Sequence, residues 1–149
     1  MKDIRRPDAF EPLVERLTNP KLPETGVAVF STIMDLLIFA AGVGFSKKRR
    51  VTVPSTGKAV PYRIFENNQK EGYIFLIALA DSQDGTAIAS DNDDEAARIF
   101  EEYAAGGMEE ISSWLNEAPT DISGVQPLLS KIQDLIGSTA TTLPDPSAI

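Results

Sequence analysis

Neither cysteine nor histidine occurs among the 149 residues of the sequence. Without cysteine, the chain forms no disulfide, no thiolate metal site and no cysteine nucleophile, which is consistent with a reducing compartment. Without histidine, it has no Ser-His-Asp triad, no histidine general base and no histidine ligand for zinc. Catalysis would have to rely on carboxylates, lysine, tyrosine or a carboxylate-bound metal. The composition therefore lowers the expectation that the protein is an enzyme.

Long hydrophobic runs are absent as well. The most apolar stretch covers residues 27–41, which is short of the ~20 residues that span a bilayer. Ser31, Thr32 and Asp35 also interrupt it, and the N-terminal residues are not followed by the apolar region of a signal peptide. We therefore expect a cytoplasmic protein that does not contact a membrane.

Charge is unevenly distributed along a chain whose net charge is −8. Residues 1–63 hold 11 Lys/Arg and 6 Asp/Glu, a net charge of +5, whereas residues 64–149 hold 3 and 16, a net charge of −13. Two interpretations remain open. The two halves could present oppositely charged surfaces to partners or to other copies, or they could neutralise each other where they pack together.

The spacing of apolar residues predicts an all-α (mainly α) fold, a compact bundle of five or six helices. A single domain over residues 1–137 would be followed by a flexible tail over 138–149. Residues 51–65, which include two prolines, predict an irregular β-hairpin-like excursion. Helices are expected over residues 8–18, 27–43, 73–80, from 91 to a stop or kink at Gly106-Gly107, over 108–116, and from 123 to 136. A buried strand remains the alternative for residues 73–80, which are apolar throughout.

Capping and glycine signals define the expected helix ends. Asp8 and Glu11 have the spacing of a capping box, which predicts Asp8 as the N-cap of the first helix. Gly44 is a suitable left-handed residue just beyond the second helix. Gly137 is expected to stop the last one.

A basic run, Lys47, Lys48, Arg49 and Arg50, follows the second predicted helix, whose dipole favours cations at that end. With Lys58 and Arg63, the run could neutralise about four to six phosphates and bind nucleic acid in a salt-sensitive way. The alternative is a solvated helix end that balances the acidic half, since the net charge of −8 repels DNA. For the aromatic residues that flank this region, we expect core burial rather than stacking on bases; they are Tyr62, Phe65 and Tyr73.

Acidic pairs predict a solvated helical face that could dock a basic partner; they are Glu101, Glu102, Glu109 and Glu110. Trp114 is expected on a helix-packing face or in an oligomer interface. The acidic run 91–95 lacks the glycine and the final glutamate of a calcium loop, so it is interpreted as the cap of a helix. We assign no catalytic residue, no metal ligand and no cofactor.

Four segments, taken in order, resemble a known bacterial family. They are Ile4-Arg5-Arg6-Pro7, residues 34–45 (MDLLIFAAGVGF) with Arg49-Arg50, Ile64-Phe65-Glu66-Asn67, and residues 99–109 (IFEEYAAGGME). Over residues 4–136, their order and spacing resemble the Dnd system-associated protein 4 family. The resemblance implies a bacterial cytoplasm and a locus for DNA phosphorothioation, in which sulphur replaces a non-bridging phosphate oxygen and marks self DNA for defence. It transfers no catalytic residue to this chain.

Three functional hypotheses follow. The first is a non-enzymatic accessory protein of a DNA phosphorothioation-linked defence system, which binds a partner protein and could contact DNA backbone through the basic run. The alternative is a general interaction module whose acidic face docks a basic partner without touching nucleic acid. The third, a carboxylate-metal hydrolase, has no recognised motif in this sequence. Contact with DNA and self-association both stay open.

Overall fold

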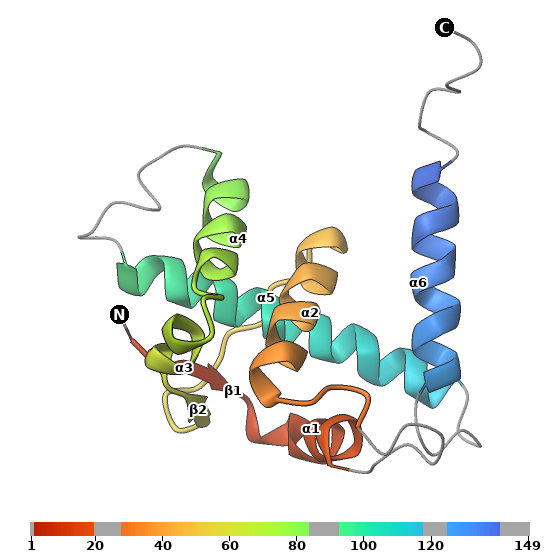
Figure 1. Ribbon diagram of the computed structural model, residues 1–149, viewed down its shortest axis with the longest axis horizontal. Coiled ribbons are helices and arrows are strands. Elements are labelled where there is room, and N and C mark those ends of the chain that lie inside the picture. Colours follow the sequence, from red (N-terminus) through yellow and green to blue (C-terminus); the bar gives the residue numbers. More distant parts are fainter. Residues whose placement is uncertain (1, 20–27, 84–92, 118–124, 141–149) are drawn as a thin grey trace, which may run out of the picture.

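Helices dominate the structure, a computed structural model that describes residues 2–19, 28–83, 93–117 and 125–140 (Figure 1). The predicted mainly α fold is confirmed, and residues 73–80 lie in a helix rather than a strand. In chain order, the elements are β1 (Ile4–Arg6), the 3-10 helix η1 (Asp8–Phe10), α1 (Glu11–Thr18), α2 (Ile33–Ser46), β2 (Lys58–Val60), α3 (Tyr62–Asn67), α4 (Gly72–Ser82), α5 (Asp93–Asn116) and α6 (Val125–Ala140).

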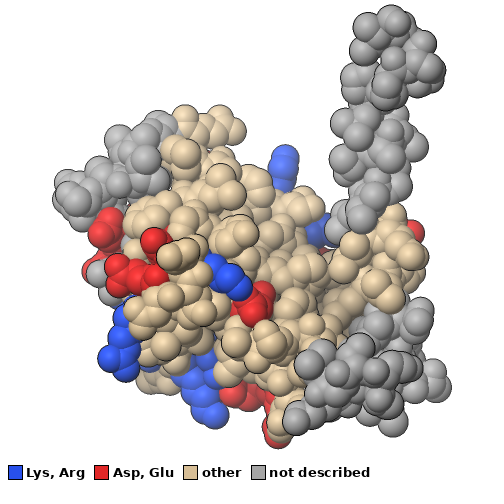
Figure 2. All heavy atoms as spheres, in the orientation of Figure 1, with Lys and Arg blue, Asp and Glu red and all other residues tan. Residues whose placement is uncertain are grey.

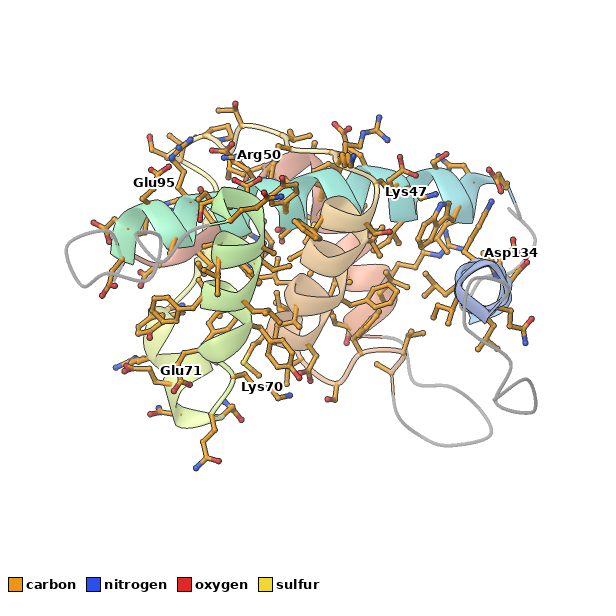
Figure 3. The ribbon with its side chains drawn as sticks, turned by 90° about the horizontal axis from the view of Figure 1, so that it is seen from above. Lys47, Arg50, Lys70, Glu71, Glu95 and Asp134 are labelled. Carbon is orange, nitrogen blue, oxygen red and sulfur yellow. The ribbon has the colours of Figure 1, made fainter. Side chains whose placement is uncertain are left out.

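The longest helix, α5, is the scaffold on which the other elements are placed. Its 24 residues span about 36 Å at 1.5 Å per residue. Helices α2 and α4 lie side by side across it, β1 also lies against it, and α6 follows its end at a steep angle (Figures 1 and 3). The core fills the space between these elements, and its largest fully buried side chains include those of Leu17, Leu36, Leu37, Phe65, Ile74, Phe100 and Met108.

Close backbone contacts explain why α5 continues through Gly106 and Gly107, where the sequence predicted a stop or kink. A Cβ atom on Gly107 would overlap the carbonyl group of Ala40 in α2, and one on Gly106 would overlap that of Arg49. On the α2 side, Gly44 lies in the same way against the carbonyl oxygen of Tyr103. Only glycine allows backbones to approach so closely. The prediction of Gly44 as a left-handed cap is therefore wrong, because the residue lies inside α2.

The first two helices begin later than the sequence predicted. Helix α1 starts at Glu11, and the expected capping box is not formed, because the Glu11 carboxylate instead accepts a hydrogen bond from Nε of Arg6 at 2.6 Å. Helix α2 starts at Ile33, with Thr32 as its N-cap. The hydroxyl oxygen of Thr32 accepts the backbone N–H of Asp35 at 3.1 Å, which satisfies one of the free donors of the first turn.

Residues 51–65 do not form the predicted hairpin. Strand β2 pairs antiparallel with β1 near the N-terminus, so that Val60 lies opposite Ile4 and Lys58 lies opposite Arg6. After Pro61, the chain turns into α3 instead of continuing as a strand. Within residues 51–65, the structure has one strand, residues 58–60, and this strand pairs with β1 rather than with another part of the same segment.

The last helix, α6, runs through Gly137, where a stop was predicted. Its expected start at residue 123 and the end of the expected tail, residues 141–149, lie outside the described residues. The division into a domain over 1–137 and a tail stays a prediction. Within the described ranges, no helix is both long enough and apolar enough to cross a membrane.

Candidate functional site

The basic run after α2 is folded against α5. The N–H of Arg49 donates to the carbonyl oxygen of Gly44 at 2.8 Å, and Lys48 adopts the left-handed conformation with φ 54°. Two residues further on, the N–H of Val51 donates to the carbonyl oxygen of Glu102 at 3.0 Å. The chain therefore leaves α2 along the surface of α5, where the acidic pairs lie.

Arg49 contacts both members of the second acidic pair. Its Nε lies 3.1 Å from Oε2 of Glu109, and its Nη1 lies 2.5 Å from Oε1 of Glu110. The guanidinium group is half-exposed, so each ion pair contributes less than about 1 kcal/mol to stability. The pairs nevertheless keep Arg49 directed at the protein rather than at solvent.

Arg50 joins α4 to α5. Its Nη1 lies 3.2 Å from Oδ2 of Asp81, and its Nη2 lies 3.0 Å from Oε1 of Glu102. The guanidinium carbon lies 5.3 Å from the centre of the Tyr103 ring, within the range of a cation–π interaction. The Tyr103 hydroxyl donates to Oδ1 of Asp81 at 2.5 Å. Burial, followed by this hydrogen bond and the charge of Asp81, raises the pKa of Tyr103.

The first acidic pair is buried, with Glu101 4% and Glu102 9% exposed. The prediction of a solvated face is therefore wrong for these two residues. Oε2 of Glu101 accepts hydrogen bonds from Nζ of Lys2 at 2.6 Å and from the backbone N–H of Arg5 at 2.7 Å, which ties β1 to α5. Oε2 of Glu102 accepts a hydrogen bond from Nη1 of Arg98 at 2.8 Å. Both carboxylates thus act as internal connections.

These contacts support the second interpretation of the charge asymmetry. Lys2, Arg49 and Arg50 come from the basic half of the chain, and their carboxylate partners all come from the acidic half. The two halves therefore neutralise each other in part where they pack together, and the excess of acidic residues leaves the first interpretation open.

The remaining predicted phosphate-binding residues form no single patch. Lys47 and Lys48 are exposed after the end of α2, and neither makes an ion pair within the described part of the chain. Lys58, whose Nζ lies 3.4 Å from Oε2 of Glu11, and Arg63 lie on β2 and α3, near the opposite end of α2 (Figure 1). On the face drawn in Figure 2, basic and acidic side chains are interspersed.

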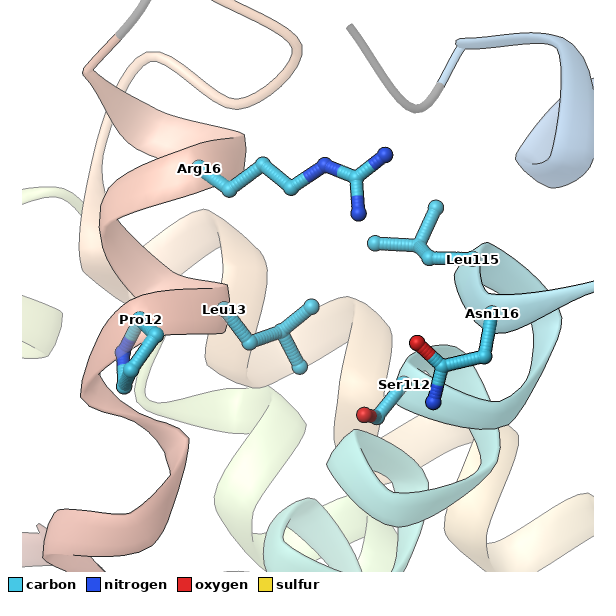
Figure 4. A pocket seen from close by; sticks show the side chains of 6 residues that line it. All are labelled: Pro12, Leu13, Arg16, Ser112, Leu115 and Asn116. Carbon is cyan, nitrogen blue, oxygen red and sulfur yellow. The ribbon is translucent and has the colours of Figure 1, made fainter. Parts of the chain in front are cut away.

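Trp114 is buried in the core, as expected for a residue on a helix-packing face. Close to it in the sequence, the last turns of α5 and helix α1 border a hollow of about 170 Å³ (Figure 4). This hollow is smaller than the clefts of about 300–1,000 Å³ that bind small molecules. Its lining comprises Pro12, Leu13, Arg16, Ser112, Leu115 and Asn116.

Two further hollows have contrasting linings. One of about 300 Å³ lies over the buried acidic pair, and most of its lining residues are polar or charged, among them Lys2, Arg5 and Arg98. The other, of about 280 Å³, is apolar and is lined from α2, α6 and the residues before α2 by Val29, Phe30, Phe39, Leu128, Leu129 and Ile132. In the described ranges, no three acidic side chains are grouped so that they could hold a metal ion.

The most exposed large apolar side chains lie on α4. Leu76 is 58% and Tyr73 48% exposed, whereas Ile74 and Ala78 on the opposite side of the helix are fully buried. Residues 72–80 contain no charged side chain. We call the outer side of this helix the α4 face. Tyr73 and Leu76 form its exposed centre, and the partly buried Phe75, Ile77 and Leu79 border it, with Phe75 and Ile77 packed against the core. Figure 2 shows that the surface over α4 and the adjoining α2 is largely free of charge.

A family model described as DNA sulphur modification system-associated protein 4 matches residues 3–140. The chain belongs to this family. The match runs from β1 to the end of α6, and it confirms the resemblance on which the sequence analysis relied. No curated protein and no solved structure matches the chain.

Membership of the DNA sulphur modification system-associated protein 4 family gives the chain a context, association with a DNA sulphur modification system. Two of the segments that carried the resemblance meet in the structure. Gly44 belongs to the segment 34–45, and Gly106 and Gly107 belong to the segment 99–109. In this family member, these segments form the close contact between α2 and α5.

Sequence reasoning missed the α4 face. It expected core burial for Tyr73 and a buried helix or a buried strand over residues 73–80, because a segment that is apolar throughout is ordinarily enclosed by neighbours. In the structure, α4 is covered by α2 and α5 on one side, and Tyr73 and Leu76 lie on the other. The missing polar stripe in residues 72–80 was the available signal, since it fits either a buried helix or a docking surface.

Proposed function

We propose that this chain is a non-enzymatic accessory protein that binds another protein of its DNA sulphur modification system through the α4 face. One observation carries the proposal: α4 exposes Leu76 and Tyr73 on a side of the helix that has no charged residue. The family description supplies the system. The lack of histidine and cysteine in the sequence supports a role outside catalysis.

The energetics favour a protein as the occupant of this surface. Full burial of one large apolar side chain contributes about 1.5–3 kcal/mol, so covering Leu76 and Tyr73 would supply a substantial part of a binding free energy. Soluble monomers rarely expose a contiguous apolar patch without a use for it. The acidic surface that the sequence suggested as a docking face is a weaker candidate, because Glu101 and Glu102 are already paired and buried.

The proposal is tested by co-expressing the chain with each other protein of the modification system. A complex is expected with one of them, and Leu76→Asp should abolish it, because the new carboxylate would have to be desolvated in an apolar interface. Ser130→Asp adds the same charge at an exposed position on α6 and should leave the complex intact. Circular dichroism would establish that both variants fold. A complex that survives Leu76→Asp would contradict the proposal.

Contact with DNA backbone is a second candidate function, and Lys47 and Lys48 favour it. They are exposed cations at a helix C-terminus, and neither makes an ion pair within the described residues. Arg49 and Arg50, by contrast, would have to leave carboxylate partners before they could bind phosphate. The expected binding is therefore weaker than the whole basic run would give.

A further inference from the structure

We infer that the segment which occupies the α4 face is an amphipathic helix of a partner protein, with lysine or arginine along the flank that meets the α3–α4 connection. The inference rests on the proposed function and specifies the partner of the same surface. Three observations support it: the paired helices, an acidic edge beside them, and a carboxylate oxygen without a hydrogen bond.

The arrangement of α2 and α4 suits a helical ligand. The two helices lie side by side (Figure 3), and each exposes apolar side chains at least in part, Ile38 on α2 and Leu76 on α4. Rows of side chains on neighbouring helices accept the ridge of a third helix. Amphipathic helices are commonly bound on such apolar surfaces.

Carboxylates lie along one edge of this surface, next to Lys70, which is itself paired with Asp35. Burial raises the pKa of Tyr62, and the nearby charges of Glu66, Glu71 and Asp93 raise it further. Oδ1 of Asp3 accepts the backbone N–H of Tyr62 at 3.4 Å. Among the described residues, none of the four carboxylates near Tyr62 forms an ion pair. Figure 2 shows acidic side chains gathered where the start of α5 meets the α3–α4 connection.

At this edge, one carboxylate oxygen of Glu71 lacks a hydrogen-bond donor. Its Oε2 atom is buried and accepts no hydrogen bond from any described residue, and the residue lies at the N-terminal end of α4 (Figure 3). An unpaired carboxylate oxygen out of contact with solvent destabilises the free protein. After a rotation of the Glu71 side chain, a lysine or arginine of a bound helix would supply the missing donor.

Charge disfavours the two other occupants. A second copy would bring an identical acidic edge and a net charge of −8, and like charges repel. Its exposed Lys47 and Lys48 follow the end of α2 rather than lying on a helix that could cover the α4 face. DNA would present phosphates to uncompensated carboxylates and offers little apolar surface for Leu76. A basic-flanked helix satisfies both the apolar face and the acidic edge.

The test uses the full chain and two labelled helical peptides of about 18 residues, five turns each. Both peptides carry the same leucine face; one has lysine on its flanks and the other has glutamate. Fluorescence anisotropy should show that the lysine peptide binds at least ~tenfold more tightly. Glu66→Gln with Glu71→Gln should reduce that preference. Equal binding of the two peptides, or a preference unchanged in the double variant, would overturn the inference.

Leu76→Asp separates docking from general attraction to an acidic protein. The substitution makes the chain more negative, so attraction based on net charge would strengthen, whereas docking on the α4 face would be lost. Ser130→Asp is the matched control and should bind the lysine peptide as the unsubstituted chain does. Tighter binding by Leu76→Asp would overturn the inference.

Two further results distinguish this inference from the proposed function. If Leu76→Asp abolishes the co-expressed complex but peptide binding is indifferent to flank charge, the proposed function stands and the inference falls. If neither the co-expressed complex nor peptide binding depends on Leu76, the proposed function and the inference are both overturned. Sedimentation velocity addresses the second copy: a dimer that Leu76→Asp dissociates would assign the α4 face to self-association and overturn the inference.

Discussion

The guanidinium group of Arg50 lies over the ring of Tyr103, with 5.3 Å between the guanidinium carbon and the ring centre. Both side chains also contact Asp81 at the end of α4, through Nη1 of Arg50 and the Tyr103 hydroxyl. Arg50 belongs to the chain after α2, Tyr103 to α5 and Asp81 to α4. This cluster therefore joins the three helical segments that form the centre of the fold.

Arg50→Ala should lower the free energy of unfolding by about 1–3 kcal/mol, because it leaves the buried carboxylate of Glu102 without one of its donors. Urea denaturation followed by circular dichroism would measure the change. Lys47→Ala, which removes a cation without an ion pair in the described residues, should change stability by less than about 0.5 kcal/mol. Equal effects of the two substitutions would contradict the structural role of Arg50.

Glycine-to-alanine substitutions should have opposite effects at two positions. Gly107→Ala should destabilise the protein by about 1–3 kcal/mol or more, because the added methyl group overlaps the backbone of Ala40. Gly42 is exposed in α2, and no atom lies within 4 Å of the place that an added methyl group would take. Gly42→Ala should therefore stabilise by about 0.5–1 kcal/mol through helix propensity. Thermal and urea unfolding of both variants would check the signs. If Gly107→Ala left the free energy of unfolding unchanged, α2 and α5 would have to be farther apart than they are in this structure.

Acid should destabilise the protein in part through Asp35. The hydrogen bond from Lys70 is the largest cause of a pKa below the usual 3.8, and the bond from Thr32 adds to it. Because the folded-state pKa is lowered, this stabilisation is present above the unfolded pKa and is lost as the pH falls through the folded value. Lys70→Gln should therefore flatten the fall of stability below about pH 5. An unchanged slope in urea titrations at several pH values would contradict the assignment.

Binding to a short DNA duplex should be weak and should depend on Lys47 and Lys48. Two phosphate contacts predict a loss of affinity of about tenfold between 50 and 200 mM salt. Fluorescence anisotropy with the doubly substituted Lys47→Ala, Lys48→Ala chain should show no binding, while its stability stays unchanged. A duplex with phosphorothioate linkages would reveal whether sulphur affects affinity. Binding that persists in the double variant would remove these lysines from the interface.

The sequence was sufficient for the helical class of the fold and for most helix positions, because apolar residues recur at helical spacing. It failed where a distant backbone decides the outcome. Gly106 and Gly107 are helix breakers by propensity, but close packing against α2 and against the chain that follows it keeps them in one continuous helix. Strand β2 pairs with residues more than fifty positions away, and a three-residue pattern does not identify such a partner.

The candidate site was harder to predict than the fold, and charge explains the difference. The basic run and the acidic pairs were recognised as separate surfaces, yet Arg49 and Arg50 bind Glu102, Glu109 and Glu110 within the same chain. One-dimensional charge counts do not show which opposite charges will meet. The exposed side of α4 could not be predicted either, because it carries no charge that would mark it. An apolar helix has the same kind of sequence whether it is covered by its own chain or by another protein.

The charge-free surface of α4 also bears on how much of this protein a cell retains. On the proposed function, a copy synthesised in excess of the partner keeps Leu76 and Tyr73 in water, where apolar surface promotes aggregation and recognition by quality-control proteases. Its abundance should therefore follow that of the partner, with surplus copies degraded. In this way the stoichiometry of the assembly would be set by turnover as well as by expression.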